Sequence, residues 1–600
     1  MKHTVALHRH RLLVLLLCLS LLVGCTDTPS PAPPVEVTRV VTVVVTPDPG
    51  PSAEPSPVAT VPPEGATLRA AIGVYPATLD PQRAESAEEQ ALLQLMYEGL
   101  TRLDEQLSPQ PGAASDWTIA DDGKTLEFHL RDGLTYANGT PLNAQRFAYA
   151  LKRALNPLTA APHGAWLDDI AGANAWRTAD PAAKIEDLLK LETAVGISAL
   201  DAGGKICQLP PEGYVQADCR TVRLELERPS AALLTVLALP VAYPTPQESV
   251  EDAGTGANWW QNSRLQAGNG PFILAHLEPY VRLAFVRNTT YWRGNARLAV
   301  LDVLVLASPD QALTLYRAGQ LDVAPLSPAD LAAVRGDRDL QAHVQIYPGA
   351  CSVGYFFNLR LAPFDAIGVR RAVAQAIDRS AWAADIDQGL GWATESWIPP
   401  GMPGSAADIR GWPFDPAAAR DALDQAGYAG AAGLPEIKLT YPATARGKAR
   451  AEFLSAQFRA NLDVTARLDP LEPDDYTAAL EAQDTLPQFY RTGYCAPYPD
   501  PAEWLDPLFR SDTTGAQLQG YANPDVDALL AHAAAEYDVT ARAELYRQAQ
   551  QQIILDLPLV VMDNIANAYL VRPGVQGLAF TPQDNVLPGL YEPLTIDVVP

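Results

Sequence analysis

Six cysteines are the residues whose chemistry can be assigned most directly from their positions in this chain of 600 residues. Thiols can form disulfides, bind metals or act as nucleophiles, and the compartment decides which of these is expected. Cys18 lies within an apolar N-terminal run, and Cys25 directly follows it. The other four are Cys207, Cys219, Cys351 and Cys495.

The N-terminal run LLVLLLCLSLLVG follows a few basic residues and fits a secretory signal better than a membrane span, because it is short. It ends in LVGC, which resembles the bacterial lipobox, where a peptidase cuts before the cysteine and the thiol receives a diacylglycerol. An ordinary signal peptide that happens to carry a cysteine is the alternative. We predict a signal peptide over 1–24 and lipidation of Cys25.

Residues 25–66 are rich in Pro, Ser, Thr and Val, cannot bury a core, and are expected to form an extended tether. From about Thr67 onward the sequence looks globular and is long enough for several lobes. The formal net charge of −26 argues against nucleic acid, which requires basic patches. We therefore predict an extracytoplasmic lipoprotein anchored to the outer face of the cell membrane.

The four remaining cysteines allow three disulfide pairings in an oxidising compartment. Cys207 and Cys219 flank the turn-rich stretch QLPPEGYVQAD, which favours a local bridge and leaves Cys351 with Cys495. Buried free thiols are the alternative. A zinc site has little support, because the chain has no CxxC and no nearby pair of histidines.

Sequence signatures of catalysis are missing: there is no GxSxG, no HExxH and no P-loop. Carboxylates are abundant, but abundance alone does not indicate the paired acids of a glycosidase. No enzyme activity, metal or cofactor is therefore expected. The histidines that follow the signal are far apart in sequence, namely His129, His163, His276, His343 and His532.

The globular part shows the patterns of a mixed α/β protein. Apolar and polar residues alternate over 126–130, 222–226 and 281–285, as in half-buried strands. Ser86 to Glu89 has the sequence of a capping box, which predicts a helix start, and apolar residues over 369–377 follow helical spacing.

Several segments then identify a family. LDPQRAESAEEQALLQLMYEGLTRLDE resembles the entry segment of the extracytoplasmic solute-binding proteins of peptide ABC transporters, the oligopeptide/dipeptide-binding family 5. The resemblance continues in family order through SDWTIADDGKTLEFHLRDGLTYANGTPLNAQRFAYALKRALNP, GNGPFILAHLEPYVRLAFVRNTTYW, ALTLYRAGQLDVAPL, FFNLRLAPFDAIGVRRAVAQAIDR and GYCAPYPDPAEWLDPLF. These segments cover nearly all of the chain after the tether.

The resemblance implies a bilobal α/β fold of the periplasmic-binding-protein type, a Venus flytrap with an extra inserted domain and a hinge of two strands. Lobe I is expected over 67–102, 241–349 and 569–600, the inserted domain over 103–240, and lobe II over 350–568. The implied function is capture of a peptide or peptide-like solute between the lobes by a monomer, followed by delivery to the membrane permease of an ABC transporter.

The resemblance also bears on the cysteines. Some family members have one cysteine just after the first hinge strand and another in a ligand-facing loop that reads G-W-C-A-D-Y. Cys351 and Cys495 match these two positions, which implies a disulfide between them. The Cys207–Cys219 pair lies in what looks like an insertion relative to the family.

Candidate ligand residues follow from the same resemblance. Tyr494 takes the tryptophan position of the loop, Arg491 matches a cleft arginine, and Glu85 matches an acid after the LDP turn. His163 or Trp166 lies near an aromatic position of the inserted domain. The alternatives are packing for the tyrosine, a surface ion pair for the arginine, and a solvated helix start for the glutamate.

One residue departs from the family. Pro497 replaces the aspartate that holds a peptide's amino terminus, and proline offers neither charge nor N–H. Asp500 or Glu85 is expected to substitute, or else the solute lacks a free amino terminus at that place. A non-peptide solute, such as an oligosaccharide or a metal complex, is the alternative, as is a surface sensor or hydrolase. An oligosaccharide would need tryptophans that stack on its sugar rings, although core packing is the favoured use of these residues. The candidates are Trp259, Trp260, Trp392, Trp397 and Trp504.

Overall fold

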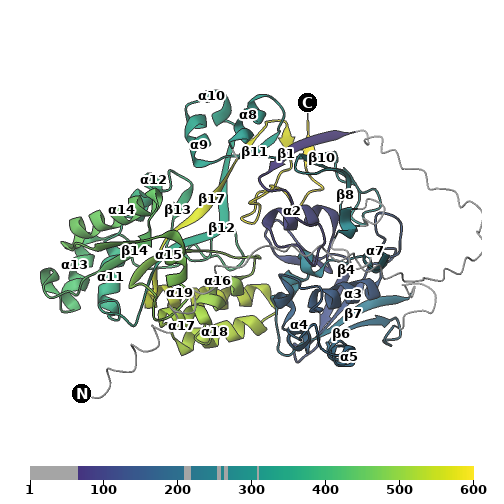
Figure 1. The fold of residues 1–600 in the computed structure, drawn as a ribbon, viewed down its shortest axis with the longest axis horizontal. Helices are drawn as coiled ribbons and strands as arrows, with labels where there is room; N and C mark the ends of the chain where they lie inside the picture. Colours follow the sequence, from purple (N-terminus) through teal and green to yellow (C-terminus); the bar gives the residue numbers. More distant parts are fainter. Residues whose placement is uncertain are drawn as a thin grey trace, which may run out of the picture. The chain divides into compact units, whose positions relative to one another are not determined.

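A computed structural model describes residues 65–207, 218–252, 258–261, 268–306, 308 and 310–599. The predicted signal peptide, the lipidation site Cys25 and nearly all of the tether over 25–66 lie outside the described residues. In the described part of the chain, no helix is long and apolar enough to cross a membrane. The same part contains three larger sheets with helices packed on them (Figure 1).

The first sheet has the strand order β1 (Ala66–Ile72), β10 (Leu298–Val305), β9 (Arg282–Arg287), β8 (Phe272–Glu278). β1 pairs with β10 in parallel, and the other neighbours are antiparallel. The helix α2 (Ala87–Met96) shares a core with this sheet. Its N-terminus is the predicted capping box, because Ser86 Oγ accepts the N–H of Glu89 while the Glu89 carboxylate accepts the N–H of Ser86.

The second sheet is antiparallel, in the order β4 (Ala114–Ile119), β5 (Thr125–Leu130), β7 (Cys219–Glu225), β6 (Ile197–Asp201). The predicted alternation over 126–130 is confirmed, since Leu126, Phe128 and Leu130 are buried. They pack in one core with the helix α3 (Ala144–Leu155). This sheet and helix therefore form one hydrophobic unit, whose core extends from Leu100 to Ala242 and also includes Tyr498.

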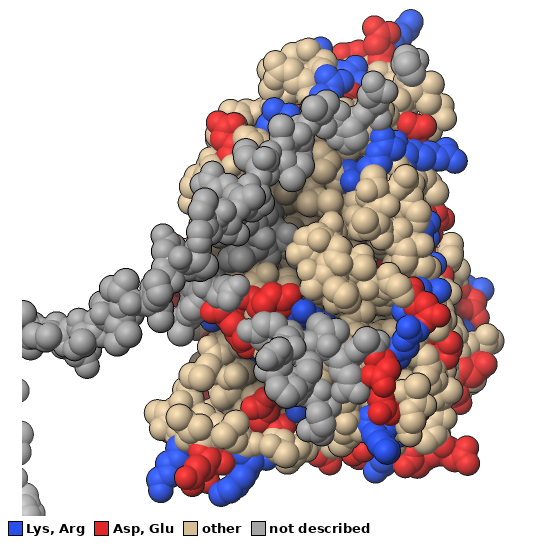
Figure 2. All heavy atoms as spheres, turned by 90° about the vertical axis from the view of Figure 1, so that its right-hand side faces the viewer, with Lys and Arg blue, Asp and Glu red and all other residues tan. Residues whose placement is uncertain are grey.

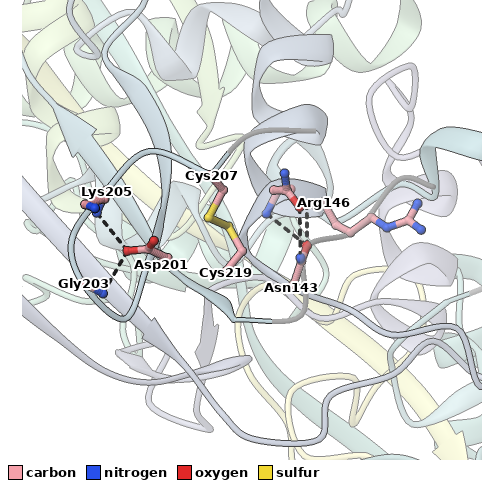
Figure 3. The surroundings of a disulfide bond; sticks show 8 residues. Asn143, Arg146, Asp201, Gly203, Lys205, Cys207 and Cys219 are labelled. Atoms are coloured by element: carbon pink, nitrogen blue, oxygen red, sulfur yellow. Dashed lines mark hydrogen bonds between the residues drawn. A yellow bond between two sulfur atoms is a disulfide. The ribbon is translucent and has the colours of Figure 1, made fainter. Parts of the chain in front are cut away.

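The Cys207–Cys219 disulfide closes one edge of that unit (Figure 3). Before Cys207, Asp201 Oδ1 accepts the N–H groups of Gly203 and Lys205 at 2.8 and 2.9 Å and shapes a tight turn. The bridge then ties the end of this turn to the start of β7. The predicted local pairing is thus present in the structure.

The third sheet has seven strands, and two of them are long. Its order is β11 (Val323–Pro325), β17 (Leu559–Val571), β12 (Val344–Phe357), β16 (Phe489–Cys495), β14 (Lys438–Pro442), β15 (Arg467–Leu471), with β13 (Gly391–Ala393) also paired to β17. β12 has 14 residues and β17 has 13, and they are antiparallel. Their register shifts between Pro348 and Ser352. The family resemblance predicts two hinge strands, and this pair has the length and pairing for that role.

Helices cover both faces of the third sheet (Figure 1). One core includes Tyr355 and Phe357 of β12 and lies against α11 (Ile367–Gln375), α13 (Pro416–Gln425) and α14 (Ala445–Leu462). The other core includes Phe356 and lies against α16 (Pro501–Phe509), α18 (Pro524–Ala535) and α19 (Val539–Asp556). Alternate residues of one strand therefore serve opposite cores.

The remaining elements are short. They are β2 (Thr101–Leu103), β3 (Pro109–Pro111), η1 (Gly164–Leu167), α4 (Ala173–Arg177), α5 (Ile185–Ala194), α6 (Leu233–Val236), η2 (Pro240–Ala242), α7 (Gln247–Asp252), η3 (Trp259–Gln261), α8 (Gln311–Arg317), α9 (Pro328–Arg335), α10 (Arg338–Gln341), α12 (Arg379–Asp385), η4 (Ala429–Ala431), α15 (Pro473–Ala479), α17 (Thr514–Gln519), β18 (Val575–Gln576) and β19 (Asp597–Val598).

Charged side chains of both signs are spread over the face drawn in Figure 2. Acidic and basic groups lie beside one another along its edges. On the described part of this face, no single sign of charge dominates.

A buried ion pair joins α3 to the segment that follows β1. Asp80 is fully buried, and its carboxylate accepts hydrogen bonds from Arg153 at 2.5 and 2.6 Å and from Trp259 Nε1 at 2.9 Å. Arg153 also donates to Gln82, whose amide in turn donates to the carbonyl of Tyr243 at 3.0 Å. The two units that carry the first and second sheets are therefore linked by one buried polar network.

Asp80→Asn should test this network, because the amide keeps the shape but leaves the charge of Arg153 buried without a counter-ion. We expect the free energy of unfolding to fall by about 3–5 kcal/mol, measured by urea denaturation. The control is Asp116→Asn, which removes an exposed pair with His129 and should cost less than about 1 kcal/mol. Equal losses in the two variants would contradict this account.

Candidate functional site

The segment between β16 and α16 is fixed at its start by a disulfide. Cys351 of β12 and Cys495 of β16 are directly opposite residues of the antiparallel pair, and their sulfurs are bonded. The pairing implied by the family resemblance is therefore present. It holds the start of the loop Cys495–Asp500 against the strand β12.

A cavity of about 250 Å³ lies along this loop, and we call it the loop cavity. Its walls include Glu85 and Gln90 from the start of α2, His163 from the segment before η1, and Cys495 to Pro497 from the loop. These residues are far apart in sequence. The structure thus brings two of the predicted ligand residues, Glu85 and His163, together with the predicted ligand loop.

His163 lines the loop cavity and belongs to a row of aromatic rings. The ring of His163 stacks on Trp166 with centroids 4.0 Å apart, and Trp166 meets Tyr498 edge-on at 5.0 Å. Burial lowers the pKa of His163 below its usual value, so its neutral form is favoured at pH 7. Its Nε2 lies 3.3 Å from the side-chain nitrogen of Gln90. His163 is therefore a polar but uncharged wall.

The negative charge of the loop cavity comes from the segment before α2 and not from the loop. Glu85 is its one acidic lining residue among the described residues, and its side chain is exposed. Pro497 lines the cavity at the place where the family has an aspartate. A cation in this cavity would therefore meet the carboxylate of Glu85 alone.

Asp500 lies outside the loop cavity. It is buried and caps α16 by accepting the N–H of Ala502 at 2.9 Å. Both carboxylate oxygens also accept hydrogen bonds from Arg542, at 2.7 and 2.9 Å. A ligand ammonium would have to compete with Arg542 for this carboxylate, so the expected replacement of the family aspartate by Asp500 stays a prediction.

Tyr494 and Arg491 lie on opposite faces of the third sheet. Tyr494 packs edge-on against Trp504 at 5.7 Å, and its hydroxyl lies 3.5 Å from Glu503 Oε2. Arg491 faces the other core and interacts electrostatically with Tyr355. The two residues therefore do not form a common site with one another, and neither lines the loop cavity.

A second cavity, of about 510 Å³, lies on the other side of Tyr498, and we call it the large cavity. Trp166 and residues near Arg228 form one wall, and α16, α18 and α19 form the other. The ring of Trp166 lines this cavity and also stacks on His163 of the loop cavity. Sequence analysis missed its acidic residues Glu503 and Asp506, which follow the family loop in the stretch PDPAEWLDP.

The tryptophans considered for sugar stacking are mostly structural. Four are at most 2% exposed and belong to hydrophobic cores, and only Trp392 is as much as 38% exposed. The buried four are Trp259, Trp260, Trp397 and Trp504. In the described part of the chain, no group of three or more His, Cys, Asp or Glu residues has the arrangement of a metal site.

Two buried carboxylates lie near Arg491. Asp387 and Asp563 are near enough for their negative charges to repel each other, and Asp563 also accepts the Nε1–H of Trp382 at 2.9 Å. Burial, together with the charge of Asp387, raises the pKa of Asp563 to about 7. Burial and repulsion by Arg491 lower the pKa of Arg450 to about 10. The surroundings of Arg491 therefore include both acidic and basic groups whose charged forms are disfavoured by burial.

Comparison with known proteins gives a family match over most of the chain. Residues 108–516 match the family of bacterial extracellular solute-binding proteins, family 5. The oligopeptide-binding protein OppA of Bacillus subtilis is 27% identical over 539 residues, covering 88% of this chain and 91% of that protein. A probable deoxycholate-binding periplasmic protein of Escherichia coli, YgiS, is 29% identical over 524 residues, covering 85% and 90%.

Solved structures show the same fold. The periplasmic murein tripeptide-binding protein MppA, in its unliganded open form, superposes with a TM-score of 0.76 at 23% identity, covering 90% of this chain and 99% of that one. The bilobal α/β architecture expected from the sequence is therefore confirmed.

The raised pKa of Asp563 predicts how stability changes with pH. A carboxyl whose pKa is raised in the folded state stabilises the protein at low pH, and this contribution is lost as the pH rises from the ordinary value of 3.8 to about 7. Asp563→Asn removes the titration and keeps the shape of the side chain. Relative to wild type, we expect the variant's free energy of unfolding to rise between pH 4 and pH 8 by up to about 4 kcal/mol.

Urea denaturation at both pH values measures this change. Asp387→Asn should give the same trend, because it removes the negative charge that helps to raise the pKa of Asp563. A difference between wild type and variant that does not change between the two pH values would contradict a raised pKa at Asp563.

Proposed function

Because this chain belongs to the bacterial extracellular solute-binding proteins of family 5, we propose that it captures a peptide or peptide-like solute and delivers it to the permease of an ABC transporter. A relative named as an oligopeptide-binding protein supports this solute class. In the same proposal, a diacylglycerol on Cys25 and the tether over 25–66 hold a monomer at the outer face of the cell membrane.

The proposed solute lies between two lobes that close on it. We assign lobe I to 67–102, 241–349 and 569–600, with the inserted domain over 103–240, and lobe II to 350–568. A solute that contacts both lobes favours the closed form, which the permease can then recognise. The strands β12 and β17 connect the lobes in this assignment, and their length supports it.

The proposal rests on the fact that three distant parts of the chain line the loop cavity. Glu85 comes from proposed lobe I, His163 from the proposed inserted domain, and Cys495 to Pro497 from proposed lobe II. A solute in this cavity would contact all three parts at once. Its contacts to both proposed lobes would stabilise the closed form, and no covalent bond would need to break.

The proposed ligand contacts differ in how the structure supports them. Glu85, His163 and Trp166 are supported by the cavity and by the ring stack. Tyr494 and Arg491 are proposed from the family resemblance alone, and Asp500 is proposed as a substitute for the family aspartate; none of the three lines the loop cavity. Main-chain hydrogen bonds, which are independent of sequence, would hold the peptide backbone.

A non-peptide solute is the second candidate, and two observations favour it. Pro497 leaves the loop without the charge that holds an amino terminus, and one relative is named as deoxycholate-binding. An oligosaccharide or a metal complex belongs to the same alternative. A sensor or a hydrolase on the same fold is distinguished by genome context and by turnover of a substrate library.

The proposed function is tested with the purified chain. Native mass spectrometry should show a co-purified solute, and calorimetry with peptides of three to five residues should show binding of one peptide per protein. Incubation with the same peptides should release no hydrolysis product. A co-purified solute that is not a peptide, together with no peptide binding, would favour the second candidate.

Pro497→Asp should restore a charge to the loop cavity. A charge-assisted hydrogen bond to a free amino terminus contributes about 1.5–3 kcal/mol, so affinity should rise roughly 10- to 100-fold for unblocked peptides. N-acetylated peptides should not gain, and Pro497→Asn is the uncharged control. An equal gain for blocked and unblocked peptides, measured by calorimetry, would show that the loop does not approach the amino end.

A further inference from the structure

Glu503 carries a carboxylate that has no ion-pair partner among the described residues. It lies in the first turn of α16, where a glutamate commonly accepts the N–H of the capping residue. Here the capping residue Asp500 donates its N–H to the carbonyl of Tyr498 instead, at 2.9 Å. The Glu503 carboxylate is turned to the hydroxyls of Tyr494 and Tyr498, and it lines the large cavity.

Other charges around this cavity are already paired. Among the described residues, Glu503 has no ion-pair partner, and the charges nearest to it include that of Asp500, which is also negative. The arginines that could neutralise it each hold another carboxylate at 3.0 Å or less. The pairs are Arg177 with Asp168, Arg228 with Asp169, Arg510 with Asp506 and with Asp512, and Arg542 with Asp500.

A second acid adds to this excess of negative charge. Asp506 also lines the large cavity, and its buried Oδ1 has no hydrogen-bond partner among the described residues. Burial raises the pKa of both acids, and that of Asp506 reaches about 7. Two desolvated carboxyls, with Arg510 beside Asp506 and no arginine at Glu503, are stabilised either by protonation or by a bound cation.

Aromatic rings complete the surroundings. Trp166, Tyr498 and Tyr546 line the same cavity, and their ring faces attract cations. The volume of about 510 Å³ is ample for an alkylammonium or a guanidinium together with part of the molecule that carries it. Carboxylate and aromatic rings are thus combined at one place.

We propose that the large cavity binds a cationic group of the solute, a primary ammonium or a guanidinium, with Glu503 as its counter-ion and the rings of Trp166 and Tyr498 as its walls. This deepens the proposed function, because it gives the solute a positive charge. It also accounts for Pro497: the anion absent from the loop is supplied on the far side of Tyr498. A basic side chain or an amino end of a peptide fits the site.

The test uses the full purified chain and two small probes of equal size. Saturation-transfer NMR at low ionic strength compares n-butylammonium with butan-1-ol. We expect the ammonium to bind and the alcohol to bind at least about 10-fold more weakly. In Glu503→Gln the ammonium should lose about 10-fold or more in affinity, while Glu481→Gln, at an exposed site outside the cavity, should bind like wild type.

Equal binding of ammonium and alcohol to the wild type would overturn the proposal, and this comparison needs no variant to fold. Retention of ammonium affinity in Glu503→Gln would also overturn it. Calorimetry with Ala-Lys-Ala and Ala-norleucine-Ala then separates the two proposals. Ammonium binding that depends on Glu503 without binding of either peptide would leave the cavity proposal standing and remove peptides as the solute.

Discussion

The pairing of β12 with β17 is the constraint on which the other parts depend. Both strands are long and central in the third sheet, so every element attached to either end is held through one hydrogen-bonded ladder. Breaking such a ladder would leave buried N–H and carbonyl groups unpaired. Bending therefore costs least where the ladder is already interrupted, between Pro348 and Ser352. At the edge of this interruption Asn564 donates to Ser352 Oγ, which donates to the carbonyl of Trp397, so side chains link β12 to β17 and to the segment after β13.

The disulfide of Cys351 lies within this interruption, and its position has a consequence for the ligand loop. The bridge fixes the end of β16 to the strand that bends, while the residues after Cys495 line the loop cavity. A movement of the proposed lobes would therefore carry the loop with lobe II as one piece. The walls from Glu85 and His163 belong to the other side. Closure would thus move the wall formed by the loop toward the walls formed by Glu85 and His163.

Local patterns predicted the elements well, because they depend on neighbours in sequence. Burial alternates over 126–130 as the apolar pattern required, and Ser86 caps its helix. The residues of the site were harder to predict from the sequence. Residues 491 and 494 are an odd number of positions apart on one strand, so alternation alone would have placed them on opposite faces. Asp500 before Pro501 has the sequence of a helix cap, but its partner Arg542 comes from another helix and could be known only from the fold.

The position of a single negative charge decides what this fold can hold. The rings of His163, Trp166 and Tyr498 form a continuous row, with the loop cavity and Pro497 at one end and the large cavity and Glu503 at the other. With Pro497 at one end of this row and Glu503 at the other, the proposed site for a cation lies beside Glu503. A solute would then enter with a different group foremost. Specificity within this architecture thus depends on charge placement along the loop and its following helix, and the fold by itself does not determine the solute.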